Sequence, residues 1–108
     1  MLVRLSDEKH IDHAEIKTVV VICTYPYPDY DPDECLGSYC VSVVTNDDTK
    51  ICAECFEWFG GYEYEITEVC RKYAERSSNI YRDLLIERIN FAKLVSLQAT
   101  SSTPKCVP

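Results

Sequence analysis

Four of the seven cysteines in this 108-residue chain form the pattern Cys35-x4-Cys40-x11-Cys52-x2-Cys55, which constrains the fold more than any other feature. Zinc takes four soft ligands at tetrahedral corners, and two close pairs of thiols supply them when the chain brings the pairs together. An odd number of cysteines cannot all pair within one chain. Because no secretory leader is recognisable, we expect a reduced, cytoplasmic or host-intracellular chain. The spacing therefore predicts structural zinc held by these four cysteines.

The chain around the cysteines predicts short strands and one hairpin. The β-branched run 16–23 has the composition of a strand. Residues 41–45 predict a second strand, 46–49 a turn, and Lys50 the start of the return strand. Residues 52–59 predict a short helix, because two glycines follow them as a helix end requires. In this arrangement the hairpin would bring both cysteine pairs to one place.

The period of the apolar residues changes after residue 66. Residues 62–66 alternate as a strand does, whereas 67–98 repeat every three or four residues and predict an amphipathic helix. Unbroken, this helix would be about 48 Å long, too long for a compact domain with a radius of gyration of about 13 Å. We therefore expect a break at 77–79, or an extension that meets a partner, including another copy of the chain. The prediction is one small α+β domain over 1–99 and a flexible tail over 100–108.

The predicted knuckle, hairpin and helix resemble a treble-clef zinc site, in which the first turn of the helix supplies the last two ligands. The resemblance covers residues 35–59. This segment is similar to nuclear-receptor zinc modules, which also carry aromatic residues at positions like those of Phe56 and Trp58. Glu54 and Glu57 stand where such modules place basic residues. The resemblance therefore implies the architecture without the DNA-binding activity.

Charge is distributed unevenly along the chain. Residues 29–70 contain eleven acidic side chains and one base, whereas residues 71–108 contain seven bases and three acids. An anionic surface of this kind repels a nucleic-acid backbone and attracts a basic surface. We therefore predict an adaptor or inhibitor, not an enzyme, that occupies a basic surface of a partner macromolecule, with nucleic-acid mimicry and a viral origin as versions of this hypothesis. The residues expected to carry the surface are Asp29, Tyr30, Asp31, Asp33, Glu34, Asp47, Asp48, Glu54 and Glu57.

Two other functions remain open from the sequence. The first is nucleic-acid binding by the basic residues of the C-terminal helix, which are Arg71, Lys72, Arg76, Arg82, Arg88 and Lys93. The second is suggested by a resemblance to zinc deaminases, which implies His13, Cys52 and Cys55 as zinc ligands and Glu15 as the acid/base. Ile51 departs from that family, which has a proline before its cysteine pair.

The cysteines also admit other states. Cys35–Cys40 or Cys52–Cys55 form disulfides if the compartment is oxidising. Cys23 and Cys70 stand among apolar residues and are expected in the core, and Cys106 is expected to be a free thiol. A membrane-spanning segment is not expected, because the longest apolar run has five residues and a spanning helix needs about 20.

Overall fold

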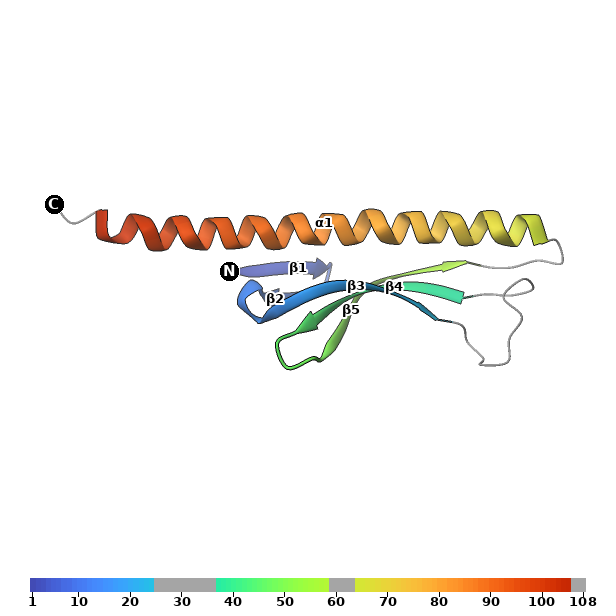
Figure 1. Ribbon diagram of the computed structural model, residues 1–108, viewed down its shortest axis with the longest axis horizontal. Helices are drawn as coiled ribbons and strands as arrows, with labels where there is room; N and C mark the ends of the chain where they lie inside the picture. The colour runs from blue at the N-terminus through green and yellow to red at the C-terminus, as the bar shows by residue number, and fades with distance from the viewer. Residues whose placement is uncertain (25–36, 59–63, 106–108) are drawn as a thin grey trace.

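The chain forms two antiparallel β-sheets packed along one long helix (Figure 1). The computed structural model describes residues 1–24, 37–58 and 64–105, with side chains for 1–24, 37–58 and 68–98. The elements in chain order are β1 (Leu2–Ser6), β2 (Lys9–Asp12), the 3-10 helix η1 (His13–Glu15), β3 (Ile16–Thr24), β4 (Gly37–Thr45), β5 (Lys50–Trp58) and α1 (Tyr64–Lys105). The predicted α+β class, with a small antiparallel sheet and a long C-terminal helix, is confirmed.

The larger sheet has the order β3-β4-β5, so β4 is its central strand. The predicted strands at 16–23 and 41–45 and the return strand from Lys50 are all present. The turn between β4 and β5 closes with a hydrogen bond from the Asp48 amide to the Thr45 carbonyl, 2.9 Å long. Asp48 has a φ of 66°, a left-handed conformation that aspartate adopts more readily than most residues. The hairpin of β1 and β2 was not predicted from the sequence.

The hydrophobic core lies between α1 and the strands. Val41 and Val43 on β4 and Leu85 on α1 are fully buried, with 0% of their surface exposed. The β1–β2 hairpin adds Leu5, which belongs to the same cluster. Each such side chain stabilises the fold by about 1.5–3 kcal/mol relative to an exposed position. The β1–β2 hairpin, which the sequence did not predict, is therefore part of the same core.

Helix α1 is continuous over 42 residues, so the break expected at 77–79 does not occur. Ser78 is buried against the strands, and its hydroxyl donates a 2.6 Å hydrogen bond to the carbonyl of Glu75. The serine is thus satisfied inside the helix and does not act as a cap. The helix also includes residues 100–105, where the sequence predicts a flexible tail. No helix in the described ranges is both long and apolar enough to span a membrane.

The short helix predicted over 52–59 is wrong, because β5 continues through Trp58. Tertiary pairing with β4 decides the conformation: Phe56 and Trp58 face the core, while Cys55 and Glu57 are exposed. This alternation with a period of two is that of a strand. The strand predicted over 62–66 is also wrong for 64–66, which begin α1, and residues 62–63 lie outside the described ranges.

Candidate metal centre

Three thiols converge on the larger sheet. Cys40 lies on β4, and Cys52 and Cys55 lie on β5. The Sγ atom of Cys55 is 2.6 Å from that of Cys40 and 3.3 Å from that of Cys52. All three sulfur atoms lie within 4.8 Å of one another. Two neighbouring strands thus present three soft donor atoms to a single point.

A β-bulge in β5 makes this convergence possible. Cys52 and Cys55 are three residues apart, so regular alternation would place them on opposite faces of the sheet. Cys55 pairs with Cys40, whereas Cys52 pairs with Ser42, only two residues further along β4. Ala53 is therefore available as the extra residue of the bulge, which returns the second thiol to the first one's face.

The thiol cluster lies on the sheet face opposite α1. On β4 the residues that pack in the core are Tyr39, Val41 and Val43, so the alternating position Cys40 points to the other face. Cys40 and Cys52 are half-buried and Cys55 is exposed. A side-chain contact nearby links the two sheets, because the Nζ atom of Lys9 on β2 donates a 2.7 Å hydrogen bond to the carbonyl of Cys52. The cluster is therefore held by backbone pairing and is open to solvent.

The surroundings of the cluster disfavour a cysteine thiolate unless a cation lies beside it. Desolvation raises the pKa of the Cys55 thiol, and the hydrogen bonds and charges of Cys40 and Cys52 raise it further. A divalent ion reverses this balance, because it binds thiolates and drives their deprotonation. Zinc thiolate sites hold sulfur atoms about 3.8 Å apart, given Zn–S bonds of about 2.3 Å. The Cys55 Sγ atom lies closer than this to its two neighbours, at 2.6 Å and 3.3 Å, so the three side chains would move apart slightly to hold a soft metal ion between them.

The structure therefore brings together three of the four cysteines predicted as ligands, and Cys35 lies outside the described residues. The treble-clef arrangement is not formed by the last pair, because Cys52 and Cys55 lie on a strand instead of the first turn of a helix. The expectation that Cys23 is a core residue is wrong, because Cys23 is exposed, whereas Cys70 is half-buried and packs against the core residues Tyr39, Trp58 and Ala74. Cys106 lies outside the described residues.

The acidic residues predicted to bind a partner divide into two groups. Asp29, Tyr30, Asp31, Asp33 and Glu34 lie outside the described ranges. The other four are exposed, and their positions on the β4–β5 hairpin are Asp47 and Asp48 in the turn and Glu54 and Glu57 on β5.

The two aspartates of the turn have structural partners. Asp48 forms a 2.8 Å ion pair with Lys17. Asp47 accepts hydrogen bonds from the hydroxyl of Thr45 and the amide of Thr49, which keep its pKa below the ordinary value of an aspartate. Both residues therefore serve the turn itself, which leaves less of their charge available to a partner.

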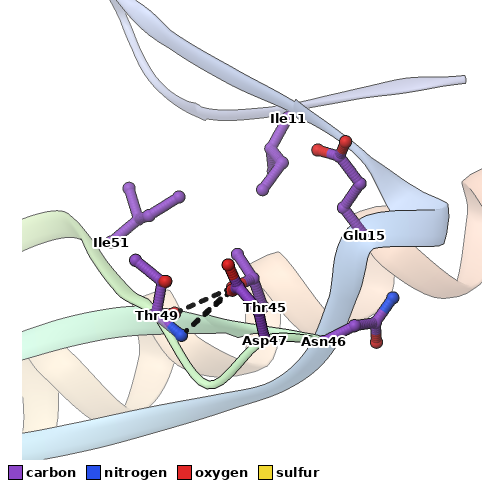
Figure 2. A pocket seen from close by; sticks show the side chains of 7 residues that line it. All are labelled: Ile11, Glu15, Thr45, Asn46, Asp47, Thr49 and Ile51. Carbon is purple, nitrogen blue, oxygen red and sulfur yellow. Dashed lines mark hydrogen bonds between the residues drawn. The ribbon is translucent and has the colours of Figure 1, made fainter.

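A cavity of about 380 Å³ lies beside this turn, between it and the β2–η1 segment (Figure 2). Figure 2 shows the Asp47 carboxylate hydrogen-bonded to Thr49, with the apolar side chain of Ile11 across the space and that of Ile51 next to Thr49. The lining residues are Ile11, Glu15, Thr45, Asn46, Asp47, Thr49 and Ile51. The lining contains two carboxylates, those of Glu15 and Asp47, but no histidine, cysteine, lysine or arginine. Among the described residues the cavity therefore lacks the groups for a second metal or catalytic site.

The basic residues predicted for nucleic-acid binding are partly engaged within the chain. Arg71 holds the pKa of Glu68 below its ordinary value and also donates a 2.9 Å hydrogen bond to the hydroxyl of Tyr39. Three of the six basic side chains contact other residues of the chain. Arg71 forms ion pairs with Glu68 and Glu75, and Arg82 forms one with Asp83. Arg88 donates a hydrogen bond to the carbonyl of Arg4. These side chains brace the helix and the strands.

The residues implied by the deaminase resemblance do not form one site. His13 lies on η1, where its Nδ1 atom is 3.2 Å from the carbonyl oxygen of Met1. Among the described residues, the three cysteines are the one group of potential metal donors within 4.8 Å of each other, and it contains neither His13 nor Glu15. The structure thus gives Cys52 and Cys55 a third thiol as companion in place of the histidine.

Sequence reasoning identified the thiols but missed what aligns them. The bulge at Ala53 was not predicted, although the three-residue spacing of Cys52 and Cys55 in a strand would have required one. Comparisons with protein-family models, with curated proteins and with solved structures gave no match.

Proposed function

We propose that this chain is a small metal-stabilised interaction module that binds zinc through Cys40, Cys52 and Cys55, with Cys35 as the fourth ligand. The observation that carries the proposal is the convergence of three thiols within 4.8 Å on one sheet face. Three thiolates suit a soft ion, and a tetrahedral structural site needs one more ligand. Cys35 is two residues before β4, so chain proximity to Cys40 favours it for that position.

The bound metal would act as a cross-link between β4 and β5. In a chain of this size the core is modest, and a structural metal adds folding free energy because the site is absent from the unfolded chain. The sheet face that carries the thiols lacks the helix that covers the other face (Figure 1). A cross-link there would stabilise the face that packing supports least.

The partner in this proposal is a protein with a basic surface. Glu57 lies on the same sheet face as the thiols, and Glu54 is exposed one residue before Cys55. The acidic stretch 29–34 joins β3 to β4 in the sequence and lies beside Cys35. Acidic groups near the metal site thus support an adaptor or inhibitor role, in which charge speeds association.

The metal is tested by native mass spectrometry and unfolding of the purified chain with added zinc. We expect one zinc per chain, and a lower unfolding midpoint after chelation. Cys55→Ser should abolish stoichiometric binding, and Cys35→Ser should weaken it. Cys23→Ser is the matched control, because Cys23 is exposed and pairs in register with the core residue Tyr39 on the other face. Absence of zinc together with two or more unreactive thiols would overturn the metal site in favour of disulfides.

The partner class is tested separately with two probes, a lysine- and arginine-rich peptide and a double-stranded DNA oligonucleotide. We expect the zinc-loaded chain to bind the peptide at low salt, with affinity falling as salt rises. Glu54→Gln with Glu57→Gln should weaken that binding and flatten its salt dependence. Retention of the DNA without the peptide would contradict the acidic-surface proposal and favour the basic helix.

A further inference from the structure

A second apolar surface runs along α1 next to the face that packs on the strands. The residues of α1 that pack in the core share one face of the helix, and they are Ala74, Leu85, Ile89 and Ala92. A different set is open to solvent: Tyr73 is 75% exposed, Val69 67%, Ile80 61% and Phe91 60%. A helix with apolar residues on two sides has more such surface than one sheet can cover. This second surface therefore requires its own explanation.

Five of the exposed apolar residues of α1, together with the half-buried Val95, follow a regular repeat. We define the outer stripe as two series with a spacing of eleven residues, Val69, Ile80 and Phe91, and Tyr73, Leu84 and Val95. The exposed residues Ile86, Leu94 and Leu97 lie outside this stripe. Residues eleven apart on an α-helix differ in direction by only about 20°, so each series stays on one face. An eleven-residue repeat is the pattern with which helices pair along their length in a right-handed supercoil. The stripe thus has the period of a helix–helix contact.

The spacing of the stripe residues is the same from either end of the helix. Its members are separated by four, seven, four, seven and four residues, with Arg82 at the centre. An antiparallel copy of the helix therefore places Tyr73 opposite the partner's Phe91 and Ile80 opposite the partner's Leu84. A two-fold interface requires a surface that is complementary to itself, which is the property of this stripe.

Charges beside the stripe match the same arrangement. Arg76 and Glu87 occupy equivalent positions, three residues after Tyr73 and after Leu84 respectively, and both are exposed. Within the described part of the chain neither of them takes part in an ion pair. The antiparallel register brings Arg76 within one residue of the level of the partner's Glu87. Symmetry repeats this contact, so one dimer would contain two opposite-charge pairs.

The end of the stripe also contains a groove. It has a volume of about 320 Å³ and lies between the end of β5 and the first turns of α1. The residues that line it are Glu57, Trp58, Val69, Cys70 and Tyr73. In the antiparallel register, the partner's Phe91 lies opposite Tyr73 at this groove, where an aromatic ring would be covered on several sides.

We propose that the outer stripe of α1 is the interface of an antiparallel two-fold dimer of this chain. The strands lie along one side of α1 (Figure 1), and every stripe residue except Val95 is exposed. At 1.5 Å per residue the stripe is about 39 Å long, and with a width of about 10 Å it would bury roughly 400 Å² on each chain. Because specific stable interfaces bury at least about 1,200 Å² in total, the dimer is expected to dissociate in the micromolar range. The inference does not depend on the metal site.

The test is sedimentation equilibrium of the full chain from about 5 to 500 µM, a range that spans the expected dissociation constant. We expect a reversible monomer–dimer equilibrium, with or without zinc. Arg76→Glu and Glu87→Arg should each weaken the dimer by roughly tenfold, because each places like charges opposite one another twice. The double variant Arg76→Glu/Glu87→Arg should restore the wild-type dissociation constant.

A second variant and a control complete the design. Phe91→Ser should weaken the dimer at least roughly tenfold, since it removes two buried rings per dimer, and circular dichroism should confirm that the helix is intact. Lys93→Glu is the control, because this exposed residue lies outside the stripe and beside β3, and it should leave association unchanged. A wild-type chain that stays monomeric throughout, or a double variant no stronger than the single ones, would overturn the antiparallel dimer.

Discussion

The two faces of the three-stranded sheet differ in what holds them together. The face toward α1 is closed by apolar packing, with Val41 and Val43 completely buried. The face away from α1 carries Cys40, Cys52 and Cys55, and its order comes mainly from the backbone pairing of β4 with β5. Packing free energy therefore accumulates on one face, while the groups capable of metal chemistry occupy the other. In a narrow sheet covered by one helix, strand alternation can thus separate the side chains that pack in the core from those that could bind a metal ion.

The largest expected effect tests the packed face. Leu85→Ala removes a fully buried side chain opposite the sheet, and we expect it to lower the free energy of unfolding by about 2–5 kcal/mol. Cys40→Ser, measured in metal-free protein, should cost less than about 1 kcal/mol, because it changes a half-buried group on the open face. Urea unfolding measures both values, and equal losses would contradict the division between the two faces.

The next effect concerns a close approach on the packed face. Trp58 on β5 pairs with Gly37 on β4, and its indole ring covers the glycine. A methyl group added at Gly37 would collide with this ring. Gly37→Ala should therefore lower stability by about 1–3 kcal/mol and change the fluorescence of Trp58. Ser38→Ala, at the adjacent position on the open face, is the control. Similar losses for the two variants would show that the two faces are equally constrained.

An effect of similar size tests the role of the bulge. Deletion of Ala53 leaves Cys52 and Cys55 two residues apart, so a regular strand would still present both on the open face. We expect zinc stoichiometry to be retained, with a stability loss of about 1–3 kcal/mol, because Glu54 would take the core-facing position that Ala53 leaves. Metal titration followed by mass spectrometry measures the stoichiometry. Loss of zinc from a folded variant would refute the proposed role of the bulge in aligning the thiols.

The smallest effect separates the turn from both faces. Asp47 has a pKa held below its ordinary value by hydrogen bonds from Thr45 and Thr49. Its contribution to stability is therefore fully present above the unfolded pKa of about 3.9 and is lost as the pH falls through the lower folded value. Asp47→Asn should reduce stability near neutrality and converge with the wild type in strong acid. Thermal unfolding across pH checks this, and a difference that stays constant in acid would disprove it.

Much of the fold follows from local signals in the sequence. The β-branched run from Ile16, the polar turn at Asn46 and the period of the C-terminal residues each specify a structure from neighbouring residues alone. These elements were predicted because backbone propensity and turn chemistry act over a few residues. The cysteine spacing likewise indicated which thiols would meet, and three of the four are found together.

The tertiary structure decided the rest. Residues 52–58 became a strand because β4 pairs with them, and the bulge at Ala53 then set the direction of the thiols. Ser78 stayed inside a continuous helix because burial against the strands left its own helix backbone as the partner for its hydroxyl. In both places the local preference was weak and the contact that outweighed it came from a distant segment. A sequence by itself fixes local preference and period, whereas the choice between near-equal local conformations belongs to long-range packing.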